Sequence, residues 1–184
     1  MRKILLTSAG LETERIMDAF LGLLAKPAKD CQALFIPTAA NSPDAIAVLP
    51  ACMDDLFRAG IPKDNIVVFD MHKTMSAPAI KQFDVIYVTG GSPQYLLQRI
   101  NETRFDKAFS AFLDNGGVYL GVSAGSIVAA NNLPQNLGYI DCTLGVHTQT
   151  GSACGTVCAA ETPRINLTDT QAILIVGNKA EIIE

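Results

Sequence analysis

The chain has 184 residues and a formal net charge of −4 at pH 7, and 49% of its residues are hydrophobic while 17% are charged. This composition predicts a single folded domain spanning residues 1–184 and excludes a disordered chain. The negative charge and the lack of a Lys/Arg cluster argue against nucleic-acid binding, and no apolar run is long enough to cross a membrane.

The first 130 residues alternate between apolar strands and amphipathic helices. Ser42-Pro43 and Ser92-Pro93 are typical helix starts, with serine as the cap and proline in the first turn. The predicted strands are residues 2–7, 31–37, 65–69, 83–89 and 117–122; the predicted helices are 11–25, 43 to a stop at Gly60, a helix opening at 93, 105–113 and 124–130. This alternation predicts an α/β fold, a doubly wound, mostly parallel sheet with helices on both faces.

Beyond residue 130 the pattern weakens. Residues 139–146 contain one short predicted strand, and residues 151–164 are rich in small side chains and carry no assignment. Residues 172–176 and 181–183, joined through Gly177-Asn178, predict a C-terminal β-hairpin. Its exposed edge would allow a homodimer to form.

The N-terminus and the cysteines indicate where the protein works. The apolar run that follows Arg2-Lys3 breaks at Thr7-Ser8, which fits a first strand better than a signal peptide. The five cysteines are an odd number and include no Cys-x-x-Cys pair. Reduced thiols and a cytoplasmic location are therefore expected.

Residues 121–125 read Gly-Val-Ser-Ala-Gly and lie between a predicted strand and a predicted helix. This context is typical of a nucleophile elbow, in which a sharp turn raises a serine hydroxyl above the sheet. A side chain at Gly121 or Gly125 would collide with the neighbouring strand or helix. Ser123 is therefore the candidate nucleophile.

A serine nucleophile needs a base, and the chain has two histidines. His72 follows a predicted strand in a polar stretch, whereas His147 ends a short apolar segment downstream of the serine. We expect His147 to be the base and His72 to lie on the surface. The base in turn needs a carboxylate, and the residues alone do not choose among the acids beyond the elbow: Asp141, Glu161, Asp169, Glu181 and Glu184.

Two backbone N–H groups are expected to stabilise an oxyanion. The first belongs to Ala124, directly after the nucleophile. The second belongs to Gly90 or Gly91, because a backbone without a side chain can approach a substrate closely. The chain has no histidine pair and no phosphate-binding glycine loop, so no metal or organic cofactor is expected.

Residues 88–97 (Val-Thr-Gly-Gly-Ser-Pro-Gln-Tyr-Leu-Leu) and 121–125 resemble the two signatures of peptidase family S51, and residues 35–39 are similar to its second-strand motif. The family includes the aspartyl dipeptidase peptidase E and the cyanophycinases. The resemblance covers residues 3 to about 130 and implies a doubly wound sheet akin to that of class I glutamine amidotransferases. Those amidotransferases carry cysteine at the elbow, where this chain has Ser123.

The resemblance implies roles for single residues. Ser123 matches the family nucleophile, and Ala124 and Gly91 match its oxyanion donors. His147 resembles the family base, although Val146 stands before it where the family usually has proline. The segment around Asp169 is similar to the one that supplies the third catalytic residue, ordinarily a glutamate.

Two acids remain candidates for the third catalytic residue, depending on the order of the catalytic residues along the chain. The resemblance implies the order Ser, His, Asp, with Asp169 as the acid. In the α/β-hydrolase order, Ser, acid, His, the acid would be Asp141, because it alone lies between Ser123 and His147.

The resemblance further implies a serine peptidase that acts on small peptides, with Asp-X dipeptides as one expectation. In peptidase E an arginine grips the substrate's aspartate side chain, and Arg164 is the only arginine of this chain in that region. Gly90 and Ser92 complete the predicted substrate-binding residues. Two alternatives stay open: a non-catalytic member of the fold that binds a small ligand or partner, and an esterase that uses the same residues.

Overall fold

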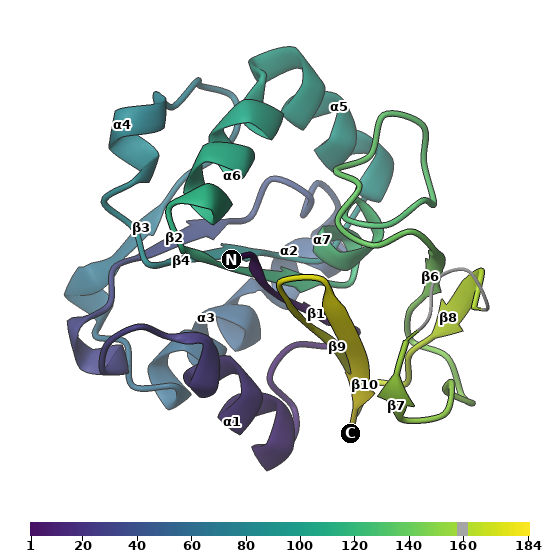
Figure 1. The fold of residues 1–184 in the computed structure, drawn as a ribbon. Coiled ribbons are helices and arrows are strands. Elements are labelled where there is room, and N and C mark those ends of the chain that lie inside the picture. The colour runs from purple at the N-terminus through teal and green to yellow at the C-terminus, as the bar shows by residue number, and fades with distance from the viewer. Residues whose placement is uncertain (158–161) are drawn as a thin grey trace.

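An eight-stranded sheet runs through the computed structural model, which describes residues 1–157 and 162–184 (Figure 1). The strands lie in the order β3 (Ile66–Val68), β2 (Ala33–Ile36), β4 (Val85–Val88), β5 (Val118–Val122), β1 (Lys3–Thr7), β9 (Ala172–Val176), β10 (Lys179–Ile183) and β7 (Gly155–Thr156). All neighbours from β3 to β1 are parallel, and the last three strands join antiparallel. The predicted α/β class with a mostly parallel sheet is confirmed.

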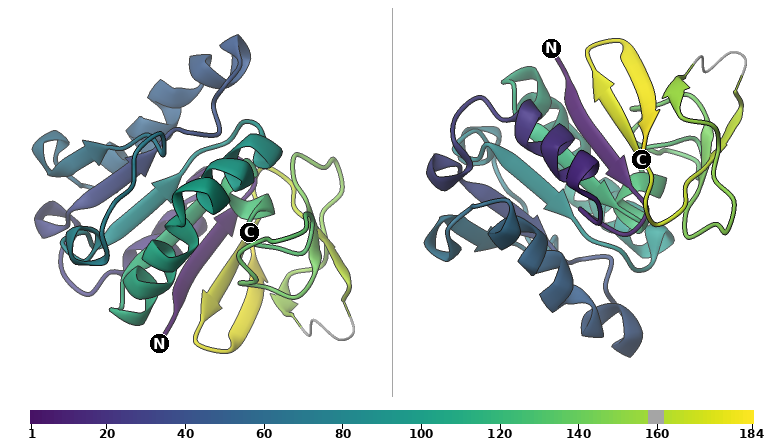
Figure 2. Two further views of the ribbon diagram at one scale, coloured as in Figure 1. Left: turned by 90° about the horizontal axis from the view of Figure 1, so that it is seen from above. Right: turned by 90° about the horizontal axis from the view of Figure 1, so that it is seen from below.

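Helices cover both faces of the sheet, as the views in Figures 1 and 2 show. One face carries α5 and α6 and the other carries α1 and α3. The helices are α1 (Glu14–Leu23), α2 (Pro43–Ala47), α3 (Leu49–Arg58), α4 (Ala77–Ile80), α5 (Pro93–Thr103), α6 (Phe105–Asp114) and α7 (Ala124–Ile127), with short 3₁₀ turns at Ala28–Asp30 and Lys63–Asn65.

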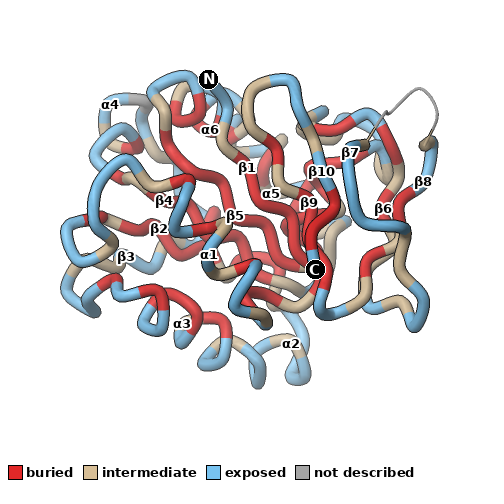
Figure 3. The backbone as a smooth tube through the Cα atoms, turned by 60° about the horizontal axis from the view of Figure 1, so that its bottom comes forward, coloured by how far each residue is buried: buried red, intermediate tan, exposed pale blue. Residues whose placement is uncertain are grey.

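The two faces bury two separate cores, because successive side chains of a strand point to opposite sides. In β1, Ile4 and Leu6 pack in the core under α5 and α6, whereas Leu5 packs with Phe20 of α1 and Leu56 of α3. All five of these side chains are fully buried. Figure 3 shows the result as a band of buried strands between half-exposed helices. Burial on both faces explains why the strands read as continuous apolar runs.

Three predicted helices differ from the observed ones. The first begins at Glu14 and not at residue 11, because Thr13 caps it by accepting a hydrogen bond from the Ile16 N–H. The helix expected from residue 43 is divided at Val48, and Pro50, which cannot donate a helical hydrogen bond, lies in the first turn of α3. The elbow helix α7 ends at Ile127 after a single turn, and the backbone then bends.

The C-terminal part of the chain is less regular. Strands β6 (Thr143–Gly145) and β8 (Arg164–Asn166) form a separate parallel pair beside the main sheet. Strands β9 and β10 pair antiparallel around Gly177, and β7 pairs with the outer edge of β10 over two residues. The edge that prompted the homodimer expectation is therefore partly covered.

No helix in residues 1–157 or 162–184 combines the length and the apolar character that a bilayer crossing requires.

Candidate active site

The loops at the carboxyl ends of β2, β4 and β5 meet at one edge of the sheet, where open α/β sheets bind ligands. The Ser92 N–H donates to the Ala39 carbonyl oxygen at 2.8 Å. Gly91 has φ +134°, and a Cβ there would lie 2.0 Å from the same oxygen. A Cβ at Gly90 would lie 3.2 Å from the Ser123 Cβ. A side chain at Gly91 would prevent this approach, so the loops after β2, β4 and β5 form one site only because glycine stands there.

Ser123 has the strained backbone of a nucleophile elbow. Its φ of 48° and ψ of −104° lie outside the usual regions for a residue with a side chain. Glycine on either side makes the turn possible: a Cβ at Gly121 would lie 2.7 Å from the Gly125 carbonyl oxygen, and a Cβ at Gly125 would lie 2.5 Å from that of Val88. The Ser123 N–H donates to the Thr7 carbonyl oxygen at 3.0 Å, which ties the turn to β1.

The parallel pairing of β6 and β8 brings His147 beside Asp169. Gly145 is opposite Asn166 in this pair, and the Leu167 N–H donates to the Gly145 carbonyl oxygen at 2.8 Å. Because parallel strands leave the pair at the same end, the residues that follow each strand become neighbours. His147 itself has φ 54°, a left-handed conformation that is rare for a residue with a side chain.

The side chains of Ser123, His147 and Asp169 form a hydrogen-bonded chain. The Ser123 Oγ lies 3.1 Å from the His147 Nε2, and the His147 Nδ1 lies 2.7 Å from the Asp169 Oδ1. Because the carboxylate accepts the Nδ1 proton, Nε2 is free to accept the serine proton. The imidazole is 51% and the carboxylate 59% exposed, so the chain opens toward solvent. This geometry suits general-base activation of a serine.

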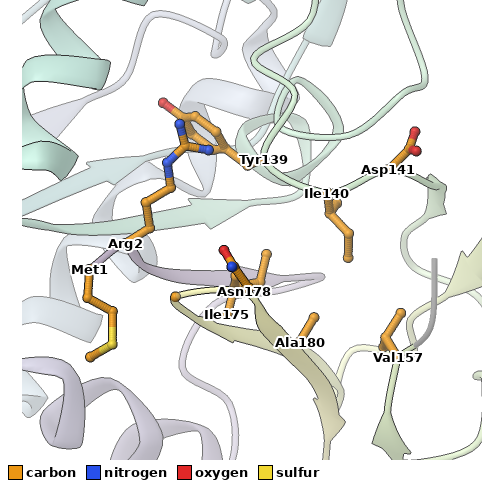
Figure 4. A pocket seen from close by; sticks show the side chains of 10 residues that line it. Met1, Arg2, Tyr139, Ile140, Asp141, Val157, Ile175, Asn178 and Ala180 are labelled. Atoms are coloured by element: carbon orange, nitrogen blue, oxygen red, sulfur yellow. The ribbon is translucent and has the colours of Figure 1, made fainter.

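The other candidate acids and the second histidine lie elsewhere. Asp141 accepts a hydrogen bond from Asn131 and lines a cavity of about 460 Å³ with Arg2 and Tyr139, shown in Figure 4. Met1 and Arg2 precede β1, so this cavity lies at the opposite end of that strand from the serine. His72 is exposed and lies 3.3 Å from the Asp70 carboxylate.

The remaining acids do not contact His147 within the part of the chain that the structure describes. Glu181 lies on β10, and Glu184 accepts a hydrogen bond from the Thr170 hydroxyl at 3.2 Å. Glu161 lies outside the described residues. The structure therefore brings Asp169 to the imidazole.

The two predicted oxyanion donors are the backbone N–H groups of Gly91 and Ala124. Neither Gly91 nor Ala124 donates its N–H to another group in residues 1–157 or 162–184. Ala124 is the first residue of α7, where no carbonyl of the helix can accept the N–H. Since α7 is one turn long, an oxyanion at this position would be stabilised by these single N–H groups more than by a helix dipole.

A cavity of about 540 Å³ opens beside the candidate nucleophile, between the loop after β1 and helix α3. Four charged residues on its lining were not indicated by any sequence pattern: Glu12, Asp54, Asp55 and Arg58. Arg58 pairs with both aspartates and also donates to the Leu11 carbonyl oxygen. Its guanidinium is therefore already paired with carboxylates of this chain.

Asp55 is the buried carboxylate of this wall, with 3% of its surface exposed. Burial raises the pKa of its carboxyl group, and hydrogen bonds from the Tyr87 hydroxyl at 2.6 Å and the Leu11 N–H at 3.2 Å oppose the rise. Asp55 Oδ2 also fills the space beside Gly10, where a Cβ would lie 2.4 Å from it. The loop after β1 and helix α3 are thus joined by a buried polar contact.

The predicted substrate-binding residues are only partly brought together. Gly90 and Gly91 line the cavity, whereas Ser92 uses its hydroxyl to accept the Tyr95 N–H at the start of α5. Arg164 begins β8, where its Nε donates to the Asn166 Oδ1 at 3.2 Å, and it is not part of the cavity lining. The structure thus separates Arg164 from the residues it was expected to join.

Ser8 is a site residue that sequence reasoning missed. It is fully buried at the end of β1, and its hydroxyl lies within hydrogen-bond distance of both Asp169 and the His147 backbone. The available signal was its place directly after the first strand, since the carboxyl ends of parallel strands share one edge.

No group of three His, Cys, Asp or Glu side chains in residues 1–157 and 162–184 is arranged to hold a metal ion.

Comparison with known protein sequences connects this chain to peptidases. A sequence profile of peptidase family S51 matches residues 4–141. Over 99 residues the chain is 30% identical to the uncharacterized peptidase Lin0382 of Listeria innocua and 28% identical to the uncharacterized peptidase Lmo0363 of Listeria monocytogenes. Each alignment covers 54% of this chain, and the chain spans about half the length of these relatives, 47% and 48%.

Two solved structures share the fold. A protein assigned as peptidase E from Listeria monocytogenes superposes with a TM-score of 0.79 at 21% identity, covering 100% of this chain and 98% of that one. A peptidase from an acI-B1 actinobacterium superposes with a TM-score of 0.67 at 15% identity, covering 100% and 87%.

Proposed function

Because the chain belongs to peptidase family S51, we propose that it is a serine peptidase that hydrolyses small peptides. The observation that carries the proposal is the hydrogen-bonded chain from Ser123 through His147 to Asp169, with steps of 3.1 and 2.7 Å. Separation of the serine and the histidine beyond hydrogen-bond reach would instead have favoured a non-catalytic binding protein.

The proposed reaction has two halves. In the first, the His147 Nε2 takes the Ser123 proton as Oγ bonds to the peptide carbonyl carbon; the same proton then passes to the leaving amine as the C–N bond breaks. In the second, water gives a proton to Nε2 and attacks the acyl-serine, which releases the acid and restores the serine. Asp169 holds the Nδ1 proton and stabilises the imidazolium in both halves.

The carbonyl oxygen carries negative charge in both tetrahedral intermediates. The N–H groups of Gly91 and Ala124, which have no acceptor in residues 1–157 or 162–184, are the proposed donors to it. Loss of one such donor costs roughly 10²–10³-fold in kcat in enzymes of this chemical class. These donors are backbone groups, so their placement depends on the turn geometry and not on side-chain identity.

The cavity supports a small substrate. Its volume of about 540 Å³ lies in the range of ordinary small-molecule sites. A preference for aspartate would need an unpaired cation beside the nucleophile, and Arg58, the arginine of this lining, is paired with Asp54 and Asp55. We therefore propose small peptides as substrates with no requirement for an aspartate side chain.

The test is hydrolysis of a dipeptide library together with a panel of short acyl esters. The wild-type protein should cleave a subset of the dipeptides, and Ser123→Ala should abolish that cleavage. Ser110→Ala is the matched control, because Ser110 is exposed on α6 and should retain wild-type rates. Cleavage of esters alone would favour the esterase alternative. Undiminished turnover by Ser123→Ala would refute the assignment.

A further inference from the structure

We infer that Ser8 is a positioning residue that holds the base and the acid of the active site in register with the nucleophile. The inference rests on the proposed function, because it assigns Ser8 a role toward His147 and Asp169. Ser8 is not a member of the hydrogen-bonded chain from Ser123 to Asp169. It acts through His147 and Asp169, to which it is hydrogen-bonded.

The Ser8 hydroxyl bridges two groups at once. Its Oγ donates to the Asp169 Oδ1 at 2.9 Å, and it accepts the backbone N–H of His147 at 2.7 Å. A hydroxyl has one proton and two lone pairs, so both bonds can form together. The separation of 3.5 Å between Ser8 Oγ and the His147 Nδ1 is longer, and that ring proton is already directed to Asp169.

Strands β6 and β8 are short, and these two bonds fix the residues that follow them, His147 and Asp169. The bond to the His147 N–H supports a residue whose φ of 54° is rare for a side-chain-bearing residue. The bond to Asp169 reaches the same Oδ1 that accepts the imidazole proton, which orients the carboxylate toward the ring. The Ser8 side chain is fully buried, so these two bonds satisfy a hydroxyl that has no exposed surface of its own.

The neighbouring residue holds the other half of the site. The Thr7 carbonyl oxygen accepts the Ser123 N–H at 3.0 Å and the Ser126 hydroxyl at 2.8 Å. Two consecutive residues at the end of β1 thus bind the elbow on one side and the histidine and aspartate on the other. The distance between nucleophile and base is set by this short, buried piece of backbone.

The role predicts a specific pattern among three substitutions. Ser8→Ala removes both bonds. Ser8→Cys fills the space with a slightly larger atom but provides only a weak donor and acceptor, and Ser8→Thr keeps the hydroxyl and adds a methyl group. If hydrogen bonding positions the site, the alanine and cysteine variants lose function together and the threonine variant retains more function than either. If Ser8 only fills space, the cysteine variant keeps wild-type function.

The experiment measures labelling of Ser123 by a fluorophosphonate probe as a function of probe concentration and pH, with thermal unfolding of each variant as the folding check. For Ser8→Ala and Ser8→Cys we expect the first-order labelling step to slow by about tenfold or more, by analogy with the loss of hydrogen-bond partners that orient metal ligands. The probe concentration for half-saturation should stay close to that of the wild type. The pH of half-maximal labelling should rise in both variants. Without the Ser8 donor, the Asp169 Oδ1 keeps more negative charge beside the imidazole and favours its protonated form.

Three results would decide against the inference. Labelling of Ser8→Ala at the wild-type rate would overturn it, as would a cysteine variant that labels normally. A pH profile that superposes on the wild type while the rate falls would show a purely structural role. If the wild-type protein itself is not labelled at Ser123, the proposed function fails, and this outcome is distinct from a labelled wild type with an equally reactive Ser8→Ala.

Discussion

The first 130 residues and the last 54 build their halves of the site in different ways. The first part delivers the nucleophile and the oxyanion donors from long-range strand register and close glycine contacts. The second part delivers the base and the acid from loops after two three-residue strands. The family profile ends at residue 141, before both of these side chains.

The difference teaches what each half tolerates. Around Ser123 the backbone is locked by contacts that leave no space for a methyl group at Gly121 or Gly125. Around His147 and Asp169 both side chains are about half exposed, and hydrogen bonds do more of the positioning than packing does. Volume changes should therefore damage the first half, and loss of single polar groups should damage the second.

The largest expected effect tests the acid in the second half. Asp169→Asn should lower kcat/KM by roughly 10²–10⁴-fold, because the amide favours the wrong imidazole tautomer and cannot stabilise the charged ring. Peptide hydrolysis or probe labelling measures the loss. Asp141→Asn is the matched control and should stay within about twofold, as expected of a substitution away from the site. A large loss in Asp141→Asn with a normal Asp169→Asn would reverse the assignment.

The next effect tests the packed half. In Gly125→Ala the new methyl group would lie 2.5 Å from the Val88 carbonyl oxygen. We expect a loss of about 1–3 kcal/mol in the free energy of unfolding, typical of overpacking. Gly22→Ala is the control, since nothing lies within 4 Å of a Cβ there and Gly22 is inside α1. It should gain up to about 1 kcal/mol from helix propensity.

Urea unfolding followed by circular dichroism measures both glycine variants. Equal stability of Gly125→Ala and the wild type would show that the elbow region can relax, which the comparison of the two halves excludes.

The smallest expected effect concerns substrate choice. Arg164 is outside the cavity, so Arg164→Ala should change kcat/KM for dipeptides by no more than about twofold, the range of surface substitutions. Asp-X and Asn-X dipeptides compared side by side give the readout. A strong preference for Asp-X that disappears in Arg164→Ala would mean that β8 moves toward the cavity when substrate binds.

The prediction of the first half of the site rests on local signals in the sequence. The order strand, Gly-Val-Ser-Ala-Gly and helix places Ser123, and the glycines after β4 indicate where a second loop approaches. The limits of two helices were predicted wrongly. Thr13 starts α1 as a cap and Pro50 marks the start of α3 because it lacks an N–H donor, and the spacing of apolar residues reveals neither effect.

The second half was harder to predict for a physical reason. Three-residue strands carry too few residues for a periodic pattern, so the pairing of β6 with β8 could not be foreseen. Proximity of His147 and Asp169 depends on that pairing. Arg58 and Asp55 reach the cavity only because of how α3 packs on the sheet. Ser8 reaches it only because β1 lies next to β5.

Mass-spectrometric mapping of the fluorophosphonate adduct on the wild-type protein tests the central claim most directly. We expect a single adduct on the peptide that contains Ser123, and we expect this adduct to be absent from Ser123→Ala. A folded wild-type protein that forms no adduct at Ser123, or an adduct that persists in Ser123→Ala, would contradict it.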